Sequence, residues 1–186
     1  MKIIQLHNKQ STLIKKASEQ NREAQQVLFD QFSPKMLGVC RQYVKDIHHA
    51  EDLMLQGFLK VFNNLKKFKG DGSFEGWIRR IMVNTCISYL RKKNPIQLTD
   101  EDYVFNDASI DNIENTSVED IQKLIDQLPD GYKLVFNMYA IEGYKHSEIA
   151  NKLNISEGTS KSQLFKARKW LQESYIKVNE VKNADK

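Results

Sequence analysis

Residues 146–173 read HSEIANKLNISEGTSKSQLFKARKWLQE, and this stretch decides how the C-terminal part of the chain folds. Apolar residues recur at three- and four-residue spacing on both sides of Asn154, which predicts two short helices, at about 146–153 and 157–173. We expect Asn154 to adopt the positive φ of a tight turn and Ser156 to cap the second helix. The pattern is typical of a helix-turn-helix, and an amphipathic helical hairpin with a solvated basic face is the alternative.

The second of these helices leaves polar and basic side chains on the faces that do not pack inward, as a helix that enters the DNA major groove does. The candidates for contact with DNA are Thr159, Lys161, Ser162, Gln163 and Lys166. Ser160 stands where a helix-turn-helix usually buries Val or Ile. We expect this serine either to loosen the packing or to bond back to the preceding turn.

Helical spacing also governs the N-terminal part of the chain, and no strand-like alternation occurs anywhere. The pattern predicts helix from about Thr12, a break at Ser33 and Pro34, a second helix, and a third from His48 or His49. The fold class is therefore all-α.

Residues 68–73, FKGDGS, predict a loop because glycine and aspartate favour turn geometry. A fourth helix follows over about 74–90 and ends in a basic run. Residues 95–116 have no sustained period, so we expect a flexible linker there.

Charge is distributed unevenly along the chain. Residues 1–93 hold 17 Lys and Arg against 8 Asp and Glu, whereas residues 94–120 hold 8 Asp and Glu and no Lys or Arg. Two basic blocks separated by an acidic connector are typical of a protein that meets a polyanion at both ends. We expect two helical domains, 1–94 and 117–186, joined by the acidic linker 95–116.

The composition disfavours several classes of protein. Cys40 and Cys86 are too few for a disulfide framework or a zinc site. No apolar run approaches the roughly 20 residues that span a bilayer, and the first residues do not resemble a signal peptide, so we expect a cytoplasmic protein. His48 and His49 do not form a metal cluster with the acidic residues after them, because adjacent helical positions point about 100° apart. No nucleophile–base pairing or Walker motif occurs, and we expect no enzyme and no cofactor.

Two strings carry a family resemblance. Residues 50–93 contain an acidic pair, a Gln, an aromatic helix, an F-x-G-x-x-x-F loop, a Trp, and R-I-x-x-N before a basic end. Residues 128–171 run from Leu-Pro through G-Y-x-x-x-E-I-A to G-T-x-K-S and A-R. In this order they resemble the extracytoplasmic-function (ECF) group of the bacterial sigma-70 family over nearly half the chain. The linker 95–116 is too short for the extra domain of larger sigma factors, which favours this small group.

The resemblance implies a subunit that binds core RNA polymerase, through the β′ coiled coil and the β flap, and directs promoter-specific transcription initiation. The polymerase-binding positions that match here are Glu51, Asp52, Gln56 and Phe58. Phe58 is equally well explained as a core residue. An inhibitory anti-sigma factor is common for the group, although nothing in this sequence indicates one.

The resemblance also implies two DNA contacts. At the melted −10 element a flipped base is held in a pocket with flat walls and hydrogen-bonding groups. The matching residues are Asn64, Phe68, Lys69 and Asn84, with Arg79, Arg80 and Arg91 contacting phosphates. The helix-turn-helix would read the −35 duplex. A stand-alone helix-turn-helix repressor or activator is the alternative, and it leaves the −10 residues unexplained.

Overall fold

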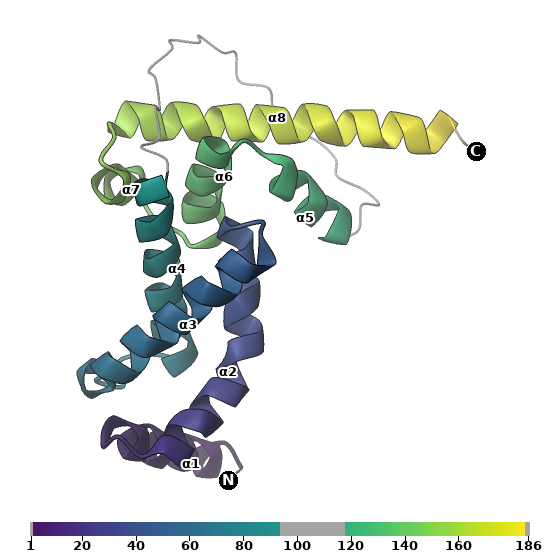
Figure 1. Cartoon of the computed structure of the whole chain (residues 1–186). Coiled ribbons are helices and arrows are strands. Elements are labelled where there is room, and N and C mark those ends of the chain that lie inside the picture. Colours follow the sequence, from purple (N-terminus) through teal and green to yellow (C-terminus); the bar gives the residue numbers. More distant parts are fainter. Residues whose placement is uncertain (1, 94–117, 185–186) are drawn as a thin grey trace. The chain divides into compact units, whose positions relative to one another are not determined.

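The computed structural model describes residues 2–93 and 118–184, and all secondary structure within these ranges is helical (Figure 1). The all-α prediction is therefore confirmed. The chain divides into two compact units, Met1–Leu90 and Arg91–Lys186. Each unit has its own buried core, as expected when two small helical domains fold separately. No helix in the described ranges is long and apolar enough to cross a membrane.

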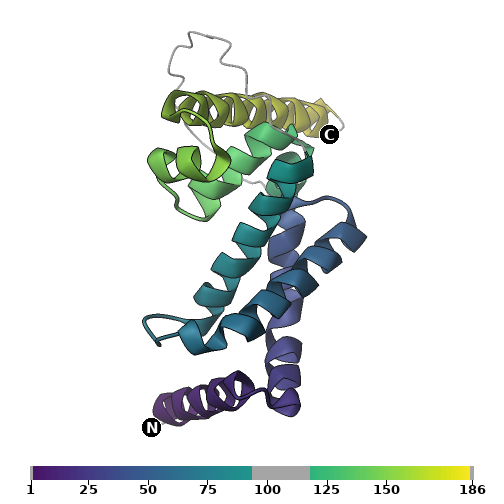
Figure 2. The ribbon, with the colours of Figure 1, turned by 60° about the vertical axis from the view of Figure 1, so that its left-hand side comes forward.

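The N-terminal unit consists of four α-helices and one 3₁₀ turn. They are α1 (Lys2–Ser18), α2 (Arg22–Tyr43), α3 (Ile47–Asn64), η1 (Leu65–Lys67) and α4 (Phe74–Lys93). Helix α2 packs against α3, and α1 lies across one end of the unit, where it contacts α2, α3 and η1 (Figure 2). The centre of the core includes Leu28, Met36, Phe58, Ile78 and Met82.

Helix α2 contains Pro34, so the predicted break at Ser33 and Pro34 is wrong. The chain breaks earlier, where Gln20 has a φ of 66° and the Asn21 side chain caps α2 by accepting a hydrogen bond from the backbone N–H of Ala24 at 2.8 Å. A proline inside a helix costs about 3 kcal/mol because one hydrogen bond is lost. This cost is offset by burial of a stripe of α2 side chains that runs from Ala24 to Tyr43 and continues past the proline.

Helix α3 begins at Ile47, one residue before the predicted start, because Asp46 caps it. The Asp46 carboxylate accepts a hydrogen bond from the backbone N–H of His49 at 2.9 Å. Helix α4 crosses α3 closely at Gly57, where a Cβ atom would collide with the sulfur of Met82. The lack of a side chain at Gly57 therefore allows Met82 of α4 to pack directly against α3.

The C-terminal unit consists of α5 (Val118–Gln127), α6 (Asp130–Phe136), a π-helical turn η2 (Asn137–Ile141), α7 (His146–Leu153) and α8 (Glu157–Ala184). Its core includes a cluster of Ile125, Leu128 and Ala167, with Tyr132, Phe136, Trp170 and Leu171 packed against it. Gly143, with a φ of 73°, follows the π-helical turn in the left-handed conformation with which glycine commonly ends a helix.

Helix α8 is longer than predicted. The sequence pattern placed its end near residue 173, whereas the helix continues to Ala184. It contains no proline and its one glycine is Gly158, near the start, so no residue within it forces an end.

Candidate nucleic-acid interface

A hollow of about 350 Å³ lies between α3 and α4 in the N-terminal unit. It is lined by Lys60, Asn64, Lys67, Trp77, Ile81, Asn84, Thr85 and Ser88. Two of the predicted −10 residues, Asn64 of α3 and Asn84 of α4, therefore line the same hollow. Half-buried Trp77 and Ile81 give the hollow flat and apolar walls.

Hydrogen bonds order the polar side of this hollow. The Asn64 amide donates to the Lys60 carbonyl at 2.8 Å, and the Lys60 ammonium donates to the Thr85 hydroxyl at 3.0 Å. The Thr85 hydroxyl in turn donates to the Ile81 carbonyl at 2.9 Å. Because an amide both donates and accepts, two asparagines beside an aromatic wall form a site able to hold the edge and the face of a nucleobase.

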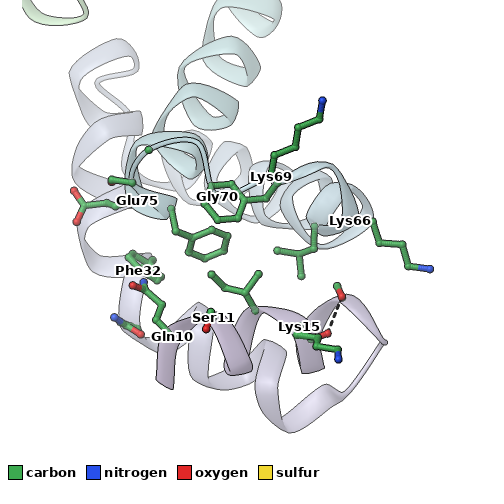
Figure 3. Close-up of a pocket in the computed structure, with 16 residues that line it drawn as sticks. Gln10, Ser11, Lys15, Phe32, Lys66, Lys69, Gly70 and Glu75 are labelled. Carbon is green, nitrogen blue, oxygen red and sulfur yellow. Dashed lines mark hydrogen bonds between the residues drawn. The ribbon is translucent and has the colours of Figure 1, made fainter. Parts of the chain in front are cut away.

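Phe68 and Lys69 do not line this hollow. They line a larger groove of about 780 Å³ between α1 and the 68–73 loop (Figure 3). The Phe68 ring lies 5.5 Å from Trp77 and 5.1 Å from Phe74, between ring centroids. The structure thus divides the predicted −10 residues between two neighbouring sites that share an aromatic cluster.

The loop itself has the predicted turn geometry. Gly70 and Gly72 have φ values of 84° and 100°, and a Cβ atom on either would meet nothing within 4 Å. Ser73 ends the loop by accepting a hydrogen bond from the backbone N–H of Gly76 at 3.0 Å, which caps α4. The loop backbone is therefore open to a close-approaching ligand.

The three predicted phosphate-binding arginines lie in different surroundings. Arg80 and Arg91 are exposed on α4. Arg79 is half-buried, and its guanidinium donates to the Gln42 side chain of α2 at 3.5 Å. Arg80 and Arg91 are therefore the more accessible cations.

On α3 the structure separates the predicted polymerase-binding residues. Asp52 and Gln56 are exposed and Glu51 is half-buried, but Phe58 is only 2% exposed. Phe58 packs its ring against Phe29 and Phe62, with centroids 4.8 and 5.9 Å away. Phe58 is therefore buried in the core, as its alternative interpretation held.

Two apolar residues on α3 that the sequence did not single out are exposed. Leu55 is 52% exposed and Leu59 is 63% exposed. Together with Asp52 and Gln56 they follow the i, i+3, i+4, i+7 spacing that places side chains on one helix face. This spacing was available in the sequence, but α3 has more than one apolar stripe, and only packing decides which is buried.

The helix-turn-helix expectations on local geometry are confirmed. Asn154 ends α7 with a φ of 57°. The Ser156 hydroxyl accepts a hydrogen bond from the backbone N–H of Thr159 at 2.9 Å, which caps α8. The hydroxyls of Ser156 and Thr159 also lie 2.8 Å apart in a hydrogen bond.

The predicted −35 residues divide by burial. Lys161 is exposed, and Ser162 and Lys166 are half-buried, whereas Thr159 and Gln163 are 3% and 5% exposed. The Thr159 hydroxyl bonds to the Ser156 hydroxyl at the helix cap, and the Gln163 side chain is buried. The accessible candidates on α8 are Lys161, Ser162 and Lys166.

Ser160 is fully buried and its hydroxyl lies 2.9 Å from Nδ1 of His146, the first residue of α7. The serine therefore bonds across to the neighbouring helix and not to its own preceding turn. The His146 ring stacks on Tyr139, with centroids 4.6 Å apart. Partial burial lowers the pKa of His146, and the positive charges of Lys161 and Arg168 lower it further.

Near the start of α3, His49 pairs with Asp46 at 2.9 Å and His48 pairs with Glu51 at 3.6 Å. Within residues 2–93 and 118–184, no group of three or more His, Cys, Asp or Glu residues gathers as metal ligands would.

Comparison with known proteins identifies both units. The family model for sigma-70 region 2 matches residues 28–96, and the model for sigma-70 region 4 matches residues 118–171. The chain is 26% identical to the RNA polymerase sigma-H factor of Pseudomonas aeruginosa over 84% of this chain and 88% of that protein. It is 27% identical to the ECF RNA polymerase sigma factor SigW of Bacillus subtilis over 86% of this chain and 95% of that protein. A solved structure of CnrH in complex with the cytosolic domain of CnrY covers 89% of this chain and 96% of that chain, with 19% identity and a TM-score of 0.48.

Proposed function

The chain belongs to the sigma-70 family, in its ECF group, and from this premise we propose how its two units direct promoter-specific transcription initiation. A sigma factor binds core RNA polymerase and enables it to recognise promoters. The proposal assigns three surfaces: the hollow between α3 and α4 to the melted −10 element, the start of α8 to the −35 duplex, and the exposed face of α3 to the polymerase.

The hollow holds an unpaired base of the −10 element. The observation that carries this assignment is the convergence of Asn64 and Asn84 beside the half-buried Trp77. A hollow with one flat wall and two amides stabilises a base that has left the stack, by contact with its face and hydrogen bonds to its edge. Promoter opening then needs no covalent chemistry, because binding the unpaired base favours the melted state.

Phosphate contacts add affinity without reading sequence. On α4 the exposed Arg80 and Arg91 supply such contacts. In the C-terminal unit Lys161 and Lys166 lie near the N-terminal end of α8 together with Ser162, and residues near the start of a recognition helix reach base edges in the major groove. We therefore assign recognition of the −35 duplex to Lys161, Ser162 and Lys166.

The polymerase contacts the face of α3 that bears Asp52, Leu55, Gln56 and Leu59. Exposed leucines with a charged and polar rim have the composition of a protein interface centre. In this proposal Leu55 and Leu59 replace Phe58 as the apolar contacts. The C-terminal unit contacts the β flap, as the family resemblance implies, without residues assigned to that contact.

A stand-alone repressor is not supported, because the sigma-70 region 2 model matches residues 28–96, a part that a repressor does not need. We place the protein in the cytoplasm, where promoters are, and propose no enzymatic activity, metal or cofactor. Regulation by an anti-sigma factor stays a prediction from the family.

The experiment that tests the proposal is transcription in vitro from a library of promoter fragments, with purified core polymerase and this protein. We expect a specific set of transcripts that requires both components. Binding of the protein alone to duplex DNA as tightly as with polymerase, without transcripts, would favour a stand-alone DNA-binding protein.

A further inference from the structure

The chain has two cysteines, Cys40 on α2 and Cys86 on α4, and they meet in the core of the N-terminal unit. Both residues are 0% exposed. We propose that this thiol pair is a redox site, which hydrogen peroxide or an organic hydroperoxide converts to a disulfide, and that the disulfide slows promoter opening. The effect on promoter opening rests on the proposed function, whereas formation of the disulfide does not.

The two thiols touch each other through a hydrogen bond between their side chains. Non-bonded atoms in contact lie about 3.5–4 Å apart, and the sulfurs of a disulfide lie about 2 Å apart. Rotation of the side chains and a small shift of the two helices close this difference. Because the chain has no other cysteine, oxidation within one molecule has a single product, a covalent link between α2 and α4.

The contact makes the two thiols unequal. The pKa of Cys40 is lowered from its ordinary value because its sulfur accepts the hydrogen bond of the Cys86 thiol, although burial opposes this effect. The pKa of Cys86 is raised, first by the same hydrogen bond and then by burial. The thiolate is the form that attacks an oxidant, so Cys40 reacts first and Cys86 reacts with its product.

Both steps of the oxidation balance with the peroxide as the sole co-reactant. The Cys40 sulfur bonds to one peroxide oxygen, the O–O bond breaks, and the other oxygen leaves with the Cys40 proton as water or alcohol. The Cys86 sulfur then attacks the sulfenic acid on Cys40. The S–S bond forms, the S–O bond breaks, and the hydroxyl leaves with the Cys86 proton as water. Each sulfur gives up one electron, and the peroxide oxygens take up both.

Burial selects the oxidant. Neither thiol is exposed, so an oxidant reaches them only when the core opens locally. Hydrogen peroxide is close to water in size, and a brief opening admits it, whereas oxidised glutathione has to bring its own sulfur against Cys40. In the cytoplasm, where we place the protein, a disulfide of this kind is transient and serves to sense an oxidant.

Cys86 lies beside the hollow that we assign to the −10 element. Thr85, the residue before it, lines that hollow and accepts a hydrogen bond from Lys60 at 3.0 Å. Asn84 lines the hollow as well. Protein cores are close-packed and transmit strain, so drawing the Cys86 sulfur toward α2 displaces this turn of α4. The Asn84 amide is displaced with it, and the hollow then holds an unpaired base less well.

The first test measures the disulfide in the full-length protein without polymerase. The protein is treated with hydrogen peroxide and desalted, and its intact mass is measured before and after treatment with dithiothreitol. We expect the monomer to lose the mass of two hydrogen atoms and to regain it with dithiothreitol, whereas oxidised methionine gains an oxygen that dithiothreitol does not remove. The variant Cys86→Ala should stop at the sulfenic acid on Cys40, which dimedone traps. Oxidised glutathione should leave the natural protein unchanged.

The second test measures promoter opening. Oxidised and desalted protein is mixed with untreated core polymerase and promoter DNA, and permanganate footprinting follows the unpaired thymines. We expect open complexes to form about three- to tenfold more slowly than with reduced protein, as for the loss of one hydrogen bond, and dithiothreitol treatment to restore the rate. The double variant Cys40→Ala, Cys86→Ala is the matched control, and the same peroxide treatment should leave its rate unchanged.

Three outcomes separate the parts of the inference. A monomer that does not lose the two hydrogen atoms, or that links only to a second copy, would overturn the redox site even if the reduced protein transcribes. A disulfide that leaves the rate of opening unchanged would overturn its coupling to the hollow. Failure of the reduced protein to give promoter-specific transcripts would instead overturn the proposed function.

Discussion

The hydroxyl of Ser160 and Nδ1 of His146 lie 2.9 Å apart, which joins the buried side of α8 to the first residue of α7. Ser160 is fully buried, so its hydroxyl has no access to water and depends on this bond. An unsatisfied buried hydroxyl costs free energy. The angle between the two helices of the DNA-reading motif is therefore stabilised by a polar contact in addition to apolar packing.

Loss of this bond should destabilise the C-terminal unit. We expect His146→Ala to lower the free energy of unfolding by about 1–3 kcal/mol, because the Ser160 hydroxyl stays buried without its partner. The double variant His146→Phe, Ser160→Val should recover most of that loss, because it removes both polar groups together. Urea unfolding measures the change, with exposed Ser147→Ala as the control. Additive effects at the two positions would contradict a direct bond.

The same pair predicts a pH dependence of stability. The pKa of His146 is lowered in the folded protein, chiefly by partial burial and then by the charge of Lys161. The unfolded chain therefore binds the proton more readily, and folding is penalised in acid. Stability from this group is fully present above the ordinary histidine pKa of about 6.5 and is lost as the pH falls from there toward the folded pKa. Urea unfolding at pH 8 and pH 5.5 should show a smaller pH difference for His146→Phe than for the natural protein.

Asn84 should act in promoter opening and not in folding. We expect Asn84→Ala or Asn64→Ala to slow the formation of open complexes roughly tenfold, through lost hydrogen bonds to a base edge. Exposed Asn63 is the matched control, since it is adjacent to Asn64 and outside the hollow. Permanganate footprinting of unpaired thymines measures opening. Normal opening by both variants would show that the hollow does not bind the −10 element.

Leu55 and Leu59 should contribute to polymerase binding. The double variant Leu55→Ser, Leu59→Ser removes exposed apolar contact area, and we expect at least tenfold weaker association with core polymerase. Val27→Ser on α2 changes a residue of similar exposure, 50% against 52% for Leu55, and should leave binding unchanged. Fluorescence anisotropy of labelled protein titrated with core polymerase gives the affinities. Equal weakening by Val27→Ser would indicate a general surface effect.

Phe58→Ala provides the contrasting core case. We expect a loss of about 3–5 kcal/mol in the free energy of unfolding, because a buried ring leaves a cavity. Thermal melting should reveal the loss without polymerase present. A variant that is as stable as the natural protein but binds polymerase weakly would indicate that Phe58 contacts the polymerase.

The sequence by itself determined the local geometry. Asn154 in the left-handed turn, the Ser156 cap and the glycines of the 68–73 loop follow from steric and hydrogen-bonding preferences of single residues and their nearest neighbours. The helical spacing determined the fold class, because a helix and its cap are encoded within a few turns of chain. The order of the two motifs determined the family.

Only the tertiary structure decided which helix faces meet. It continued α2 through Pro34, buried Phe58 while exposing Leu55 and Leu59, and brought Asn64 and Asn84 into one hollow. On a helix with more than one apolar stripe, burial depends on the neighbouring helix, and residues far apart in sequence meet only after packing. The bond between His146 and Ser160 has the same origin, because it satisfies a buried hydroxyl with a partner from another helix.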